Sequence, residues 1–235
     1  MNELALFAGA GGGILGGKLL GWRTVCAVEI NAFSASVLLA RQNDGCLPPF
    51  PIWDDVRTFD CVPWRNVVDV VSGGFPCQDI SPAGDGAGIY GERSQLWFEQ
   101  LRVVRDLEPS YALVENSAQL TRRGLGVVLS GLAEIGYNAR WDVLGAHDCG
   151  AKHIRKRKWI LAYSQRRARE GTLRGSPERV GRQLEHVPWD RTPERALSDL
   201  RGMDDGLAPV VDRTNAIRNG QVPAVVRLAW ETLKP

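Results

Sequence analysis

Short apolar segments alternate with amphipathic segments along most of the chain, and this alternation constrains the fold more than any other feature. The apolar segments predict strands at 4–8, 24–28, 67–72, 111–114, 137–143 and 158–163. Apolar residues three or four apart predict helices at 14–20, 32–41, 95–107, 125–135 and 224–233. Strands that alternate with helices are typical of an α/β domain. We therefore expect a doubly wound, mainly parallel sheet.

Three polar residues follow predicted strands at the point where each strand ends. They are Glu29, Cys77 and Glu115. Ligands of open α/β sheets bind in the crevice beyond the carboxyl ends of the strands. These three side chains are therefore candidates for one functional site.

A glycine cluster follows the first predicted strand, at 9–13, and Gly16 lies further on. Glycines here let the backbone approach a ligand and lead into the N-terminus of a helix. Glu29, after the second strand, is then placed to bind ribose hydroxyls. The pattern fits a nucleotide-type cofactor but does not distinguish NAD, FAD and S-adenosylmethionine. A tight turn without a ligand remains the alternative.

Cys77 comes directly after Pro76 and precedes a segment rich in Gly, Ser and Asp at 78–94. Proline fixes the backbone before the thiol, and such a segment is able to close over a substrate. By itself, a cysteine at a strand end is more often inert than catalytic. Glu115 is a candidate proton donor if its strand lies beside that of Cys77, because burial raises a carboxyl pKa towards neutrality.

Basic residues are concentrated in one region of a chain whose net charge is only +2. Residues 151–182 contain 11 Lys and Arg against 2 Glu, which gives +9 there and −7 elsewhere. Such a block indicates a polyanionic partner or a solvated surface segment. Arg155 and Arg157, two apart before a strand, would point to the same side if the segment is extended, and could hold a phosphate or a carbonyl oxygen.

The hydropathy and the cysteine spacing indicate whether the chain spans a membrane, binds zinc or forms disulfides. No apolar run approaches the roughly 18 residues that a membrane span needs. The five cysteines are scattered without the spacing of a zinc site. We expect reduced thiols in a cytoplasm, no membrane association and no metal.

With these residues in view, the chain resembles the DNA (cytosine-5)-methyltransferases. The matching segments occur in the order of that family and are "LFAGAGG" at 6–12, "VEIN" at 28–31, "DDV" at 54–56, "GGFPCQDIS" at 73–81, "GERSQLWFE" at 91–99, "VENS" at 114–117, "HIRKR" at 153–157 and "NGQVP" at 219–223. The resemblance implies a Rossmann-like fold with S-adenosylmethionine as cofactor and S-adenosylhomocysteine as product.

The resemblance assigns residues to two roles. It implies that Cys77 adds to C6 of cytosine, that Glu115 donates a proton to N3, and that Arg155 and Arg157 steady the oxygens. The cofactor-binding residues that it implies are Phe7, Gly9, Gly11, Gly12, Glu29, Ile30, Asp55, Val56, Pro76, Leu96, Asn219 and Gln221. It also implies double-stranded DNA as the partner, with the target base flipped out. We expect a monomer in a bacterial or phage-infected cell.

The sequence departs from the family in three residues and in size. Ser117 replaces a valine, His153 replaces a glutamine, and Arg218 replaces a glycine before Asn219. We expect a catalytic and cofactor-binding domain at 1–163, a small, basic, loop-rich insertion at 164–205 that contacts DNA in place of a larger target-recognition domain, and a segment at 206–235 that completes the first domain.

Three other functions remain open from the sequence. The first is a non-catalytic nucleic-acid-binding relative, which the short recognition region favours. The second is the same chemistry on RNA. The third is an NAD-type oxidoreductase, which the glycine cluster favours, but which leaves Pro76, Cys77, Glu115 and the basic block unexplained.

Overall fold

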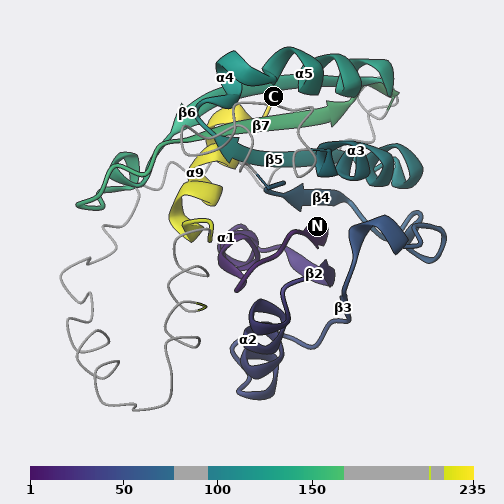
Figure 1. Cartoon of the computed structure of the whole chain (residues 1–235), viewed down its shortest axis with the longest axis vertical. Coiled ribbons are helices and arrows are strands. Elements are labelled where there is room, and N and C mark those ends of the chain that lie inside the picture. The colour runs from purple at the N-terminus through teal and green to yellow at the C-terminus, as the bar shows by residue number, and fades with distance from the viewer. Residues whose placement is uncertain (77–94, 167–211, 213–219) are drawn as a thin grey trace.

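The computed structural model describes residues 1–76, 95–166, 212 and 220–235. These residues form one seven-stranded sheet in the order β3-β2-β1-β4-β5-β7-β6 (Figure 1). The strands are β1 (Asn2–Leu6), β2 (Arg23–Val28), β3 (Ile52–Trp53), β4 (Val70–Gly73), β5 (Tyr111–Ser117), β6 (Tyr137–Leu144) and β7 (Arg157–Ser164).

The helices mostly follow the predicted ranges. They are α1 (Gly12–Leu19), α2 (Ala32–Asn43), α3 (Leu96–Leu107), α4 (Leu120–Arg123), α5 (Leu125–Glu134) and α9 (Pro223–Leu233). Short 3-10 turns lie at Val56–Thr58, Val62–Trp64 and Ala146–Cys149.

The expectation of a doubly wound, mainly parallel sheet is confirmed. Strands β3, β2, β1, β4 and β5 pair in parallel, whereas β7 runs antiparallel to both of its neighbours, β5 and β6. The sequence pattern does not predict β3, a two-residue edge strand. The pattern ends the fourth predicted strand at Val114, whereas β5 runs on to Ser117.

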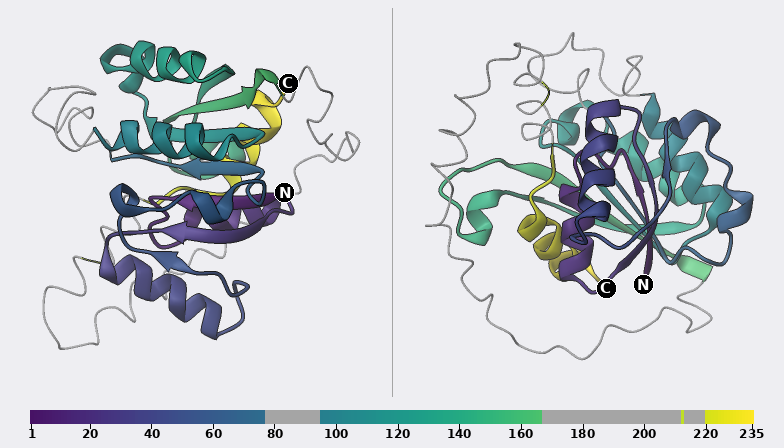
Figure 2. Two further views of the ribbon diagram at one scale, coloured as in Figure 1. Left: turned by 90° about the vertical axis from the view of Figure 1, so that its right-hand side faces the viewer. Right: turned by 90° about the horizontal axis from the view of Figure 1, so that it is seen from below.

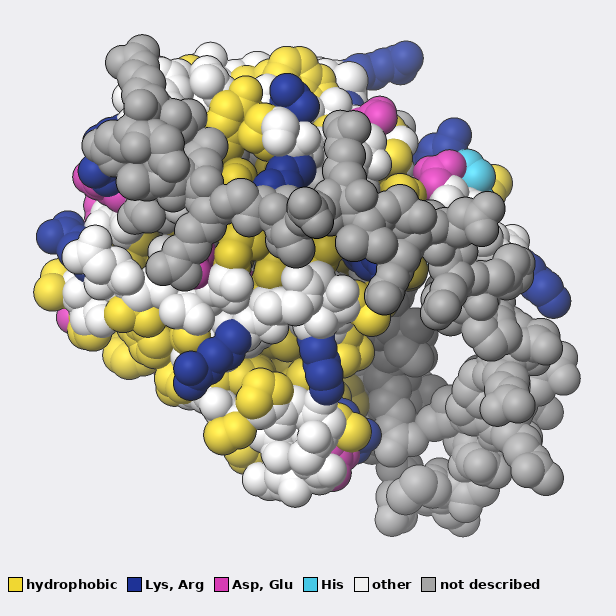
Figure 3. Space-filling model, turned by 180° about the vertical axis from the view of Figure 1, so that it is seen from behind, with side chains coloured by type: hydrophobic (Ala, Val, Ile, Leu, Met, Phe, Trp, Pro, Cys, Tyr) yellow, Lys and Arg dark blue, Asp and Glu magenta, His cyan; other side chains and the backbone are white. Residues whose placement is uncertain are grey.

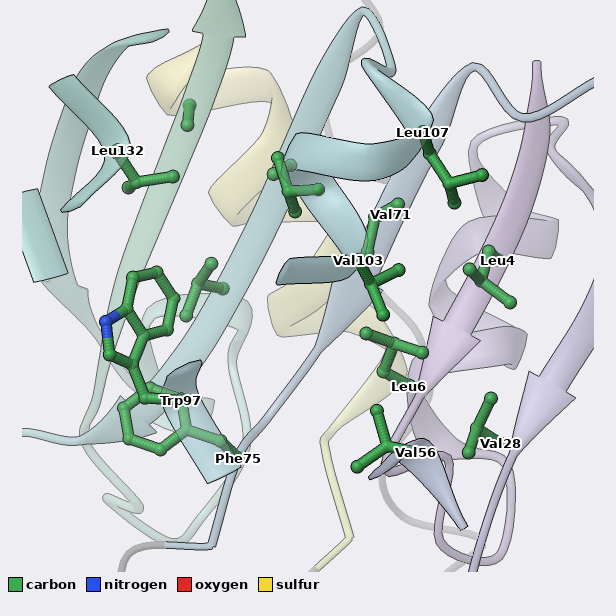
Figure 4. Close-up of a cluster of buried hydrophobic side chains, with 14 of the residues drawn as sticks. Leu4, Leu6, Val28, Val56, Val71, Phe75, Trp97, Val103, Leu107 and Leu132 are labelled. Atoms are coloured by element: carbon green, nitrogen blue, oxygen red, sulfur yellow. The ribbon is translucent and has the colours of Figure 1, made fainter. Parts of the chain in front are cut away.

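Helices cover both faces of the sheet (Figure 2). Side chains of a strand alternate between the faces. Leu4 and Leu6 of β1 belong to a core cluster that includes residues of α3 and α5, whereas Ala5 belongs to one that includes residues of α1 and α2. The larger core lies on the first face, where Trp97, Phe75 and Leu132 cluster with valines from the sheet (Figure 4).

The last helix, α9, lies beside α1 and covers the second face of the sheet (Figure 1). Its Trp230 makes edge-to-face contacts with Trp22 at 4.8 Å and with Tyr111 at 4.9 Å between ring centroids. Gly16 of α1 meets Val226 of α9, which allows the two helices to approach closely. The end of the chain is therefore built into the same core as its beginning.

Two further features concern the described ranges and their surface. No described helix has both the length and the apolar character that a membrane crossing requires. Within the same ranges, no group of three His, Cys, Asp or Glu side chains is placed to hold a metal ion. On the face in Figure 3, Lys and Arg side chains lie scattered among hydrophobic ones.

Candidate active site

A cavity of about 290 Å³ lies beyond the carboxyl ends of the central strands. The chain proceeds outward from β1 to β2 and β3, and then returns to place β4 and β5 on the other side of β1. This reversal of strand order opens a crevice between β1 and β4, which is where doubly wound sheets bind ligands. The lining comes from the ends of β1, β2, β4 and β5, the start of β7, and the segment before α9.

The glycine segment after β1 forms one wall of the cavity. Phe7, Gly9 and Gly11 have φ values of 51°, 53° and 91°, in the left-handed region. Glycine adopts this region without strain, whereas Phe7, the first residue after β1, is a bulky residue in a conformation that such residues rarely adopt. Phe7, Gly9 and Gly13 line the cavity, whereas Gly11 is the N-cap of α1.

Glu29 follows β2 and faces the same cavity. Its Oε2 accepts a hydrogen bond from the backbone N–H of Gly9 at 2.6 Å, and its Oε1 accepts one from Asn31 at 2.7 Å. These two bonds fix the carboxylate between the glycine segment and the start of α2. A carboxylate in this position can accept hydrogen bonds from two neighbouring hydroxyl groups of a ligand whose other part lies against the glycine segment.

Gly12 and Gly13 meet the segment before α9 rather than open space. A Cβ on Gly12 would collide with the backbone carbonyl of Gln221, and one on Gly13 would lie 2.5 Å from Gln221 Oε1. The sequence predicted that these glycines let the backbone approach a ligand. The structure shows that they also let the end of the chain pack onto the N-terminus of α1.

The end of β4 carries the chain towards Cys77. Strands β4 and β5 are neighbours, with Gly73 opposite Val114. The strand that carries Glu115 therefore lies beside the strand that leads to Cys77, as its proposed role as a proton donor requires. The side chain of Asn116 donates a hydrogen bond to the carbonyl of Phe75 at 3.0 Å, and Pro76 lines the cavity. Cys77 itself lies outside the described residues, as does the segment at 78–94.

Glu115 lies on β5, the strand next to β4, and lines the cavity. Its Oε1 forms an ion pair with Arg157 Nε at 3.1 Å, and its Oε2 accepts a hydrogen bond from Gln221 Nε2 at 3.5 Å. Burial raises the pKa of Glu115, whereas Arg157, Gln221 and Arg155 act in the opposite direction. The Glu115 side chain keeps 12% of its surface exposed, and it lines the cavity, so it is accessible to a ligand there.

The two arginines of "HIRKR" have different partners. Strand β7 begins only at Arg157, and Arg155 has a φ of 29°, so the two do not share an extended segment. Arg157 lines the cavity. Arg155 instead donates a hydrogen bond from Nη2 to the carbonyl oxygen of Gly220.

Six of the described residues that were predicted to bind the cofactor do not line the cavity: Gly11, Gly12, Ile30, Asp55, Val56 and Leu96. Asp55 is paired with Arg57, with 2.6 Å between Oδ2 and Nη2, and caps the turn that starts at Val56. Val56 is buried in the core, and Leu96, the first residue of α3, packs against that core. Ile30 is 67% exposed. Asn219 and Arg218 lie outside the described residues.

Several cavity residues have no role assigned to them from the sequence, although Asn31 and Asn116 stand in its "VEIN" and "VENS" motifs. They include Asn31, Ser34, Ser72 and Asn116. Asn31 and Ser34 form an N-cap, because the side chain of Asn31 accepts a hydrogen bond from the Ser34 N–H at 2.9 Å. An asparagine just before a helical pattern is a sequence signal for such a cap. Asp54, of the "DDV" segment, lines a separate hollow between α2 and β3.

The strand order and the helices on both faces of the sheet define a Rossmann-like α/β fold, which solved methyltransferase structures share. The structure matches a putative DNA modification methyltransferase encoded within an Escherichia coli prophage, with a TM-score of 0.57, 23% identity, and coverage of 71% of this chain and 47% of that one. It also matches Dnmt2 of Spodoptera frugiperda, with a TM-score of 0.56, 20% identity, and coverage of 69% and 50%.

The chain belongs to the C-5 cytosine-specific DNA methylase family, whose family model matches residues 1–215. It is 38% identical over 136 residues to the type II methyltransferase M.Eco47II of Escherichia coli, covering 56% of this chain and 31% of that protein. It is 32% identical over 163 residues to M.CviJI of Paramecium bursaria Chlorella virus IL3A, covering 68% and 42%. The chain thus spans less than half the length of these relatives.

Proposed function

We propose that the protein transfers a methyl group from S-adenosylmethionine to C5 of cytosine in DNA. The observation that carries the proposal is the placement of Glu115. This carboxyl group lies in the cavity, paired with Arg157, on the strand next to the one that leads through Pro76 into Cys77.

The cavity would hold the cofactor. Glu29 would accept hydrogen bonds from the ribose hydroxyls, and the backbone from Gly9 onward would approach the methionine part. Phe7 would lie against the adenine. The sulfonium of the bound cofactor supplies an electrophilic methyl group. Asp55 would join the set only after giving up its pair with Arg57.

The proposed chemistry begins at the pyrimidine ring. The thiolate of Cys77 forms a bond to C6, and the electrons of the C5–C6 double bond move to C5 as Glu115 donates its proton to N3. C5 would then take up the methyl group that S-adenosylmethionine supplies, with S-adenosylhomocysteine as the leaving group. A base removes the C5 proton, the double bond re-forms, the thiolate leaves C6, and the N3 proton returns to Glu115.

The electrostatics of the site suit a proton donor. Burial raises the pKa of Glu115, so the carboxyl keeps its proton closer to neutral pH than an exposed glutamate does. Arg157 limits this shift and fixes the carboxyl in place. Once the proton has left, the guanidinium stabilises the carboxylate, so the pair serves both halves of the transfer.

Access to C5 and C6 requires the target base to leave the duplex, since a stacked base is out of reach of the thiol. The basic block at 151–182 would bind phosphates and offset the free energy of unstacking. The segment at 164–205 would supply the remaining DNA contacts. Residues 167–205 of that segment lie outside the described ranges.

Covalent trapping tests the proposal. Duplex DNA with 5-fluorocytosine at its target sites is mixed with the protein and S-adenosylmethionine, and adducts are resolved by denaturing electrophoresis. Because fluorine cannot leave C5 as a proton does, we expect a stable adduct with the native chain and none with Cys77→Ala. Cys46→Ala, which changes an exposed cysteine, is the matched control and retains the adduct.

The contrary outcomes point to the other functions. The proposal fails if no adduct forms on a library of DNA sequences while the protein still binds DNA, which is the result for a non-catalytic relative. It also fails as stated if the adduct forms only on structured RNA that contains the same fluorinated base.

A further inference from the structure

Gln221 occupies the point where three walls of the cavity meet. Its backbone and side chain lie against Gly12 and Gly13 at the start of α1. Its Nε2 lies 3.5 Å from Glu115 Oε2, within hydrogen-bond range. A Cβ on Gly74 would lie 3.0 Å from the same Nε2 and would collide with the same carboxylate oxygen. The absence of a side chain at Gly74 therefore lets the amide and the carboxyl meet.

The backbone of this segment is held by a residue of the arginine motif. Arg155 donates a hydrogen bond to the carbonyl of Gly220, the residue directly before Gln221. On the other side, Pro223 starts α9, which packs against α1 and the sheet. The backbone on both sides of Gln221 is thus held, which limits where its amide can lie relative to Glu115.

We propose that Gln221 is a positioning residue for Glu115, holding the carboxyl from the side opposite to Arg157. The inference rests on the proposed function, because it assigns a partner to the proposed proton donor. It also gives Arg155 a role different from that of Arg157. Arg155 would act through the backbone of the last segment, whereas Arg157 contacts the carboxyl directly.

The two contacts leave Glu115 with one oxygen towards each partner. Oε1 faces the Arg157 guanidinium and Oε2 faces the Gln221 amide. The charged groups that act on this carboxyl are Arg157 and Arg155, and Asp212 lines the same cavity. An N–H that donates to a carboxylate favours its charged form, so Gln221 lowers the pKa of Glu115.

The test measures the titration of Glu115 and the kinetics separately. Gln221→Met keeps the length of the side chain but removes the donor. We expect it to raise the pKa of Glu115 by about one unit, which is the order expected for one hydrogen bond to a charged group. Gln221→Glu places a second carboxyl there and should raise the pKa further. The pKa is read from the side-chain carboxyl signal in ¹³C NMR, assigned by its loss in Glu115→Gln.

The kinetic arm separates this role from direct cofactor binding. In Gln221→Met we expect a lower kcat, with the KM for S-adenosylmethionine changed by less than about twofold, since an interaction that acts on the transition state alone lowers kcat. Gln165→Met is the matched control. Its amide also donates a hydrogen bond, to Asn138 at 3.0 Å, but at an exposed site away from the cavity. It should leave both quantities unchanged.

An unchanged Glu115 pKa in both Gln221 variants overturns the inference. A raised KM with an unchanged pKa does so as well, and assigns Gln221 to cofactor binding instead. The NMR titration does not require turnover, so it remains decisive for this contact even if the trapping experiment finds no methyltransferase chemistry.

Discussion

At the scale of single residues, Glu3 is an acidic side chain without exposed surface. It is fully buried in β1, where its two oxygens accept hydrogen bonds from Thr24 at 2.8 Å and from Ser72 at 2.6 Å. Burial raises the pKa of Glu3 to about 7, and the two hydroxyl groups only partly oppose the shift. Glu3 thus ties β1 to β2 and β4 while remaining protonated below neutral pH.

The titration of Glu3 predicts how stability depends on pH. Between pH 4.5 and about 7 the folded protein keeps this proton, whereas the unfolded chain releases it. The contribution of Glu3 to stability therefore falls as pH rises through that window, by about 3 kcal/mol in total. Glu3→Gln does not titrate. Urea unfolding should show the variant gaining about that much relative to the native chain between pH 4.5 and pH 8. A difference that stays constant with pH would contradict the shift.

At the scale of elements, the sequence predicted every described strand and helix of five residues or more to within a few residues. Alternation and periodicity carry that information locally. Neither pattern reports whether neighbouring strands run parallel or antiparallel, however, so the antiparallel direction of β7 relative to β5 and β6 was not predicted. Strand β3 was missed because two residues are too few for a pattern.

For the site as well, the sequence motifs indicated some residues, whereas the contacts between distant residues were not predicted. The order of the motifs pointed to Phe7, Gly9, Glu29, Glu115 and Arg157, all of which line the cavity. The contact of Arg155 with Gly220 joins residues that are 65 apart in the chain, and no local pattern reports such a contact. Cys77 and Asn219, outside the described residues, stay predictions.

The approach of α1 to α9 gives an element-scale prediction. A Cβ on Gly16 would collide with Val226 Cβ and would lie 2.7 and 2.8 Å from its two Cγ atoms. Overpacking of this kind typically costs 1–3 kcal/mol, more than the roughly 1 kcal/mol that alanine gains over glycine in a helix. We expect Gly16→Ala to lower the free energy of unfolding in urea, and Val226→Gly to be less harmful in that background than in the native chain.

Gly126 of α5 provides the matched control, since a Cβ there would meet nothing within 4 Å. Gly126→Ala should therefore leave stability unchanged or raise it. If Gly16→Ala behaves in the same way as Gly126→Ala, the close approach of the two helices is not maintained in solution.

At the scale of the whole molecule, the fold is closed by its last helix. Helix α9 covers the face formed by Tyr111 and Leu113 of β5 and by Trp159 and Leu161 of β7. It begins at Pro223, two residues after Gln221, which contacts Glu115. The same short stretch of chain thus completes a core and one wall of the cavity, so damage to the core should be felt at the cavity.

Trp230 tests this coupling. It is 4% exposed and packs edge-to-face on Trp22 and Tyr111, so Trp230→Ala should cost about 3–5 kcal/mol in the free energy of unfolding, as other buried tryptophans do. The control is Trp141→Ala on β6, where the side chain is 45% exposed and the loss should be smaller. Urea unfolding gives both values.

Where Trp230→Ala remains folded, amide hydrogen exchange at Gln221 should accelerate more than exchange in β1, because α9 no longer holds that segment. Equal acceleration throughout the domain would show instead that α9 stabilises the fold without specifically holding the segment that contacts Glu115.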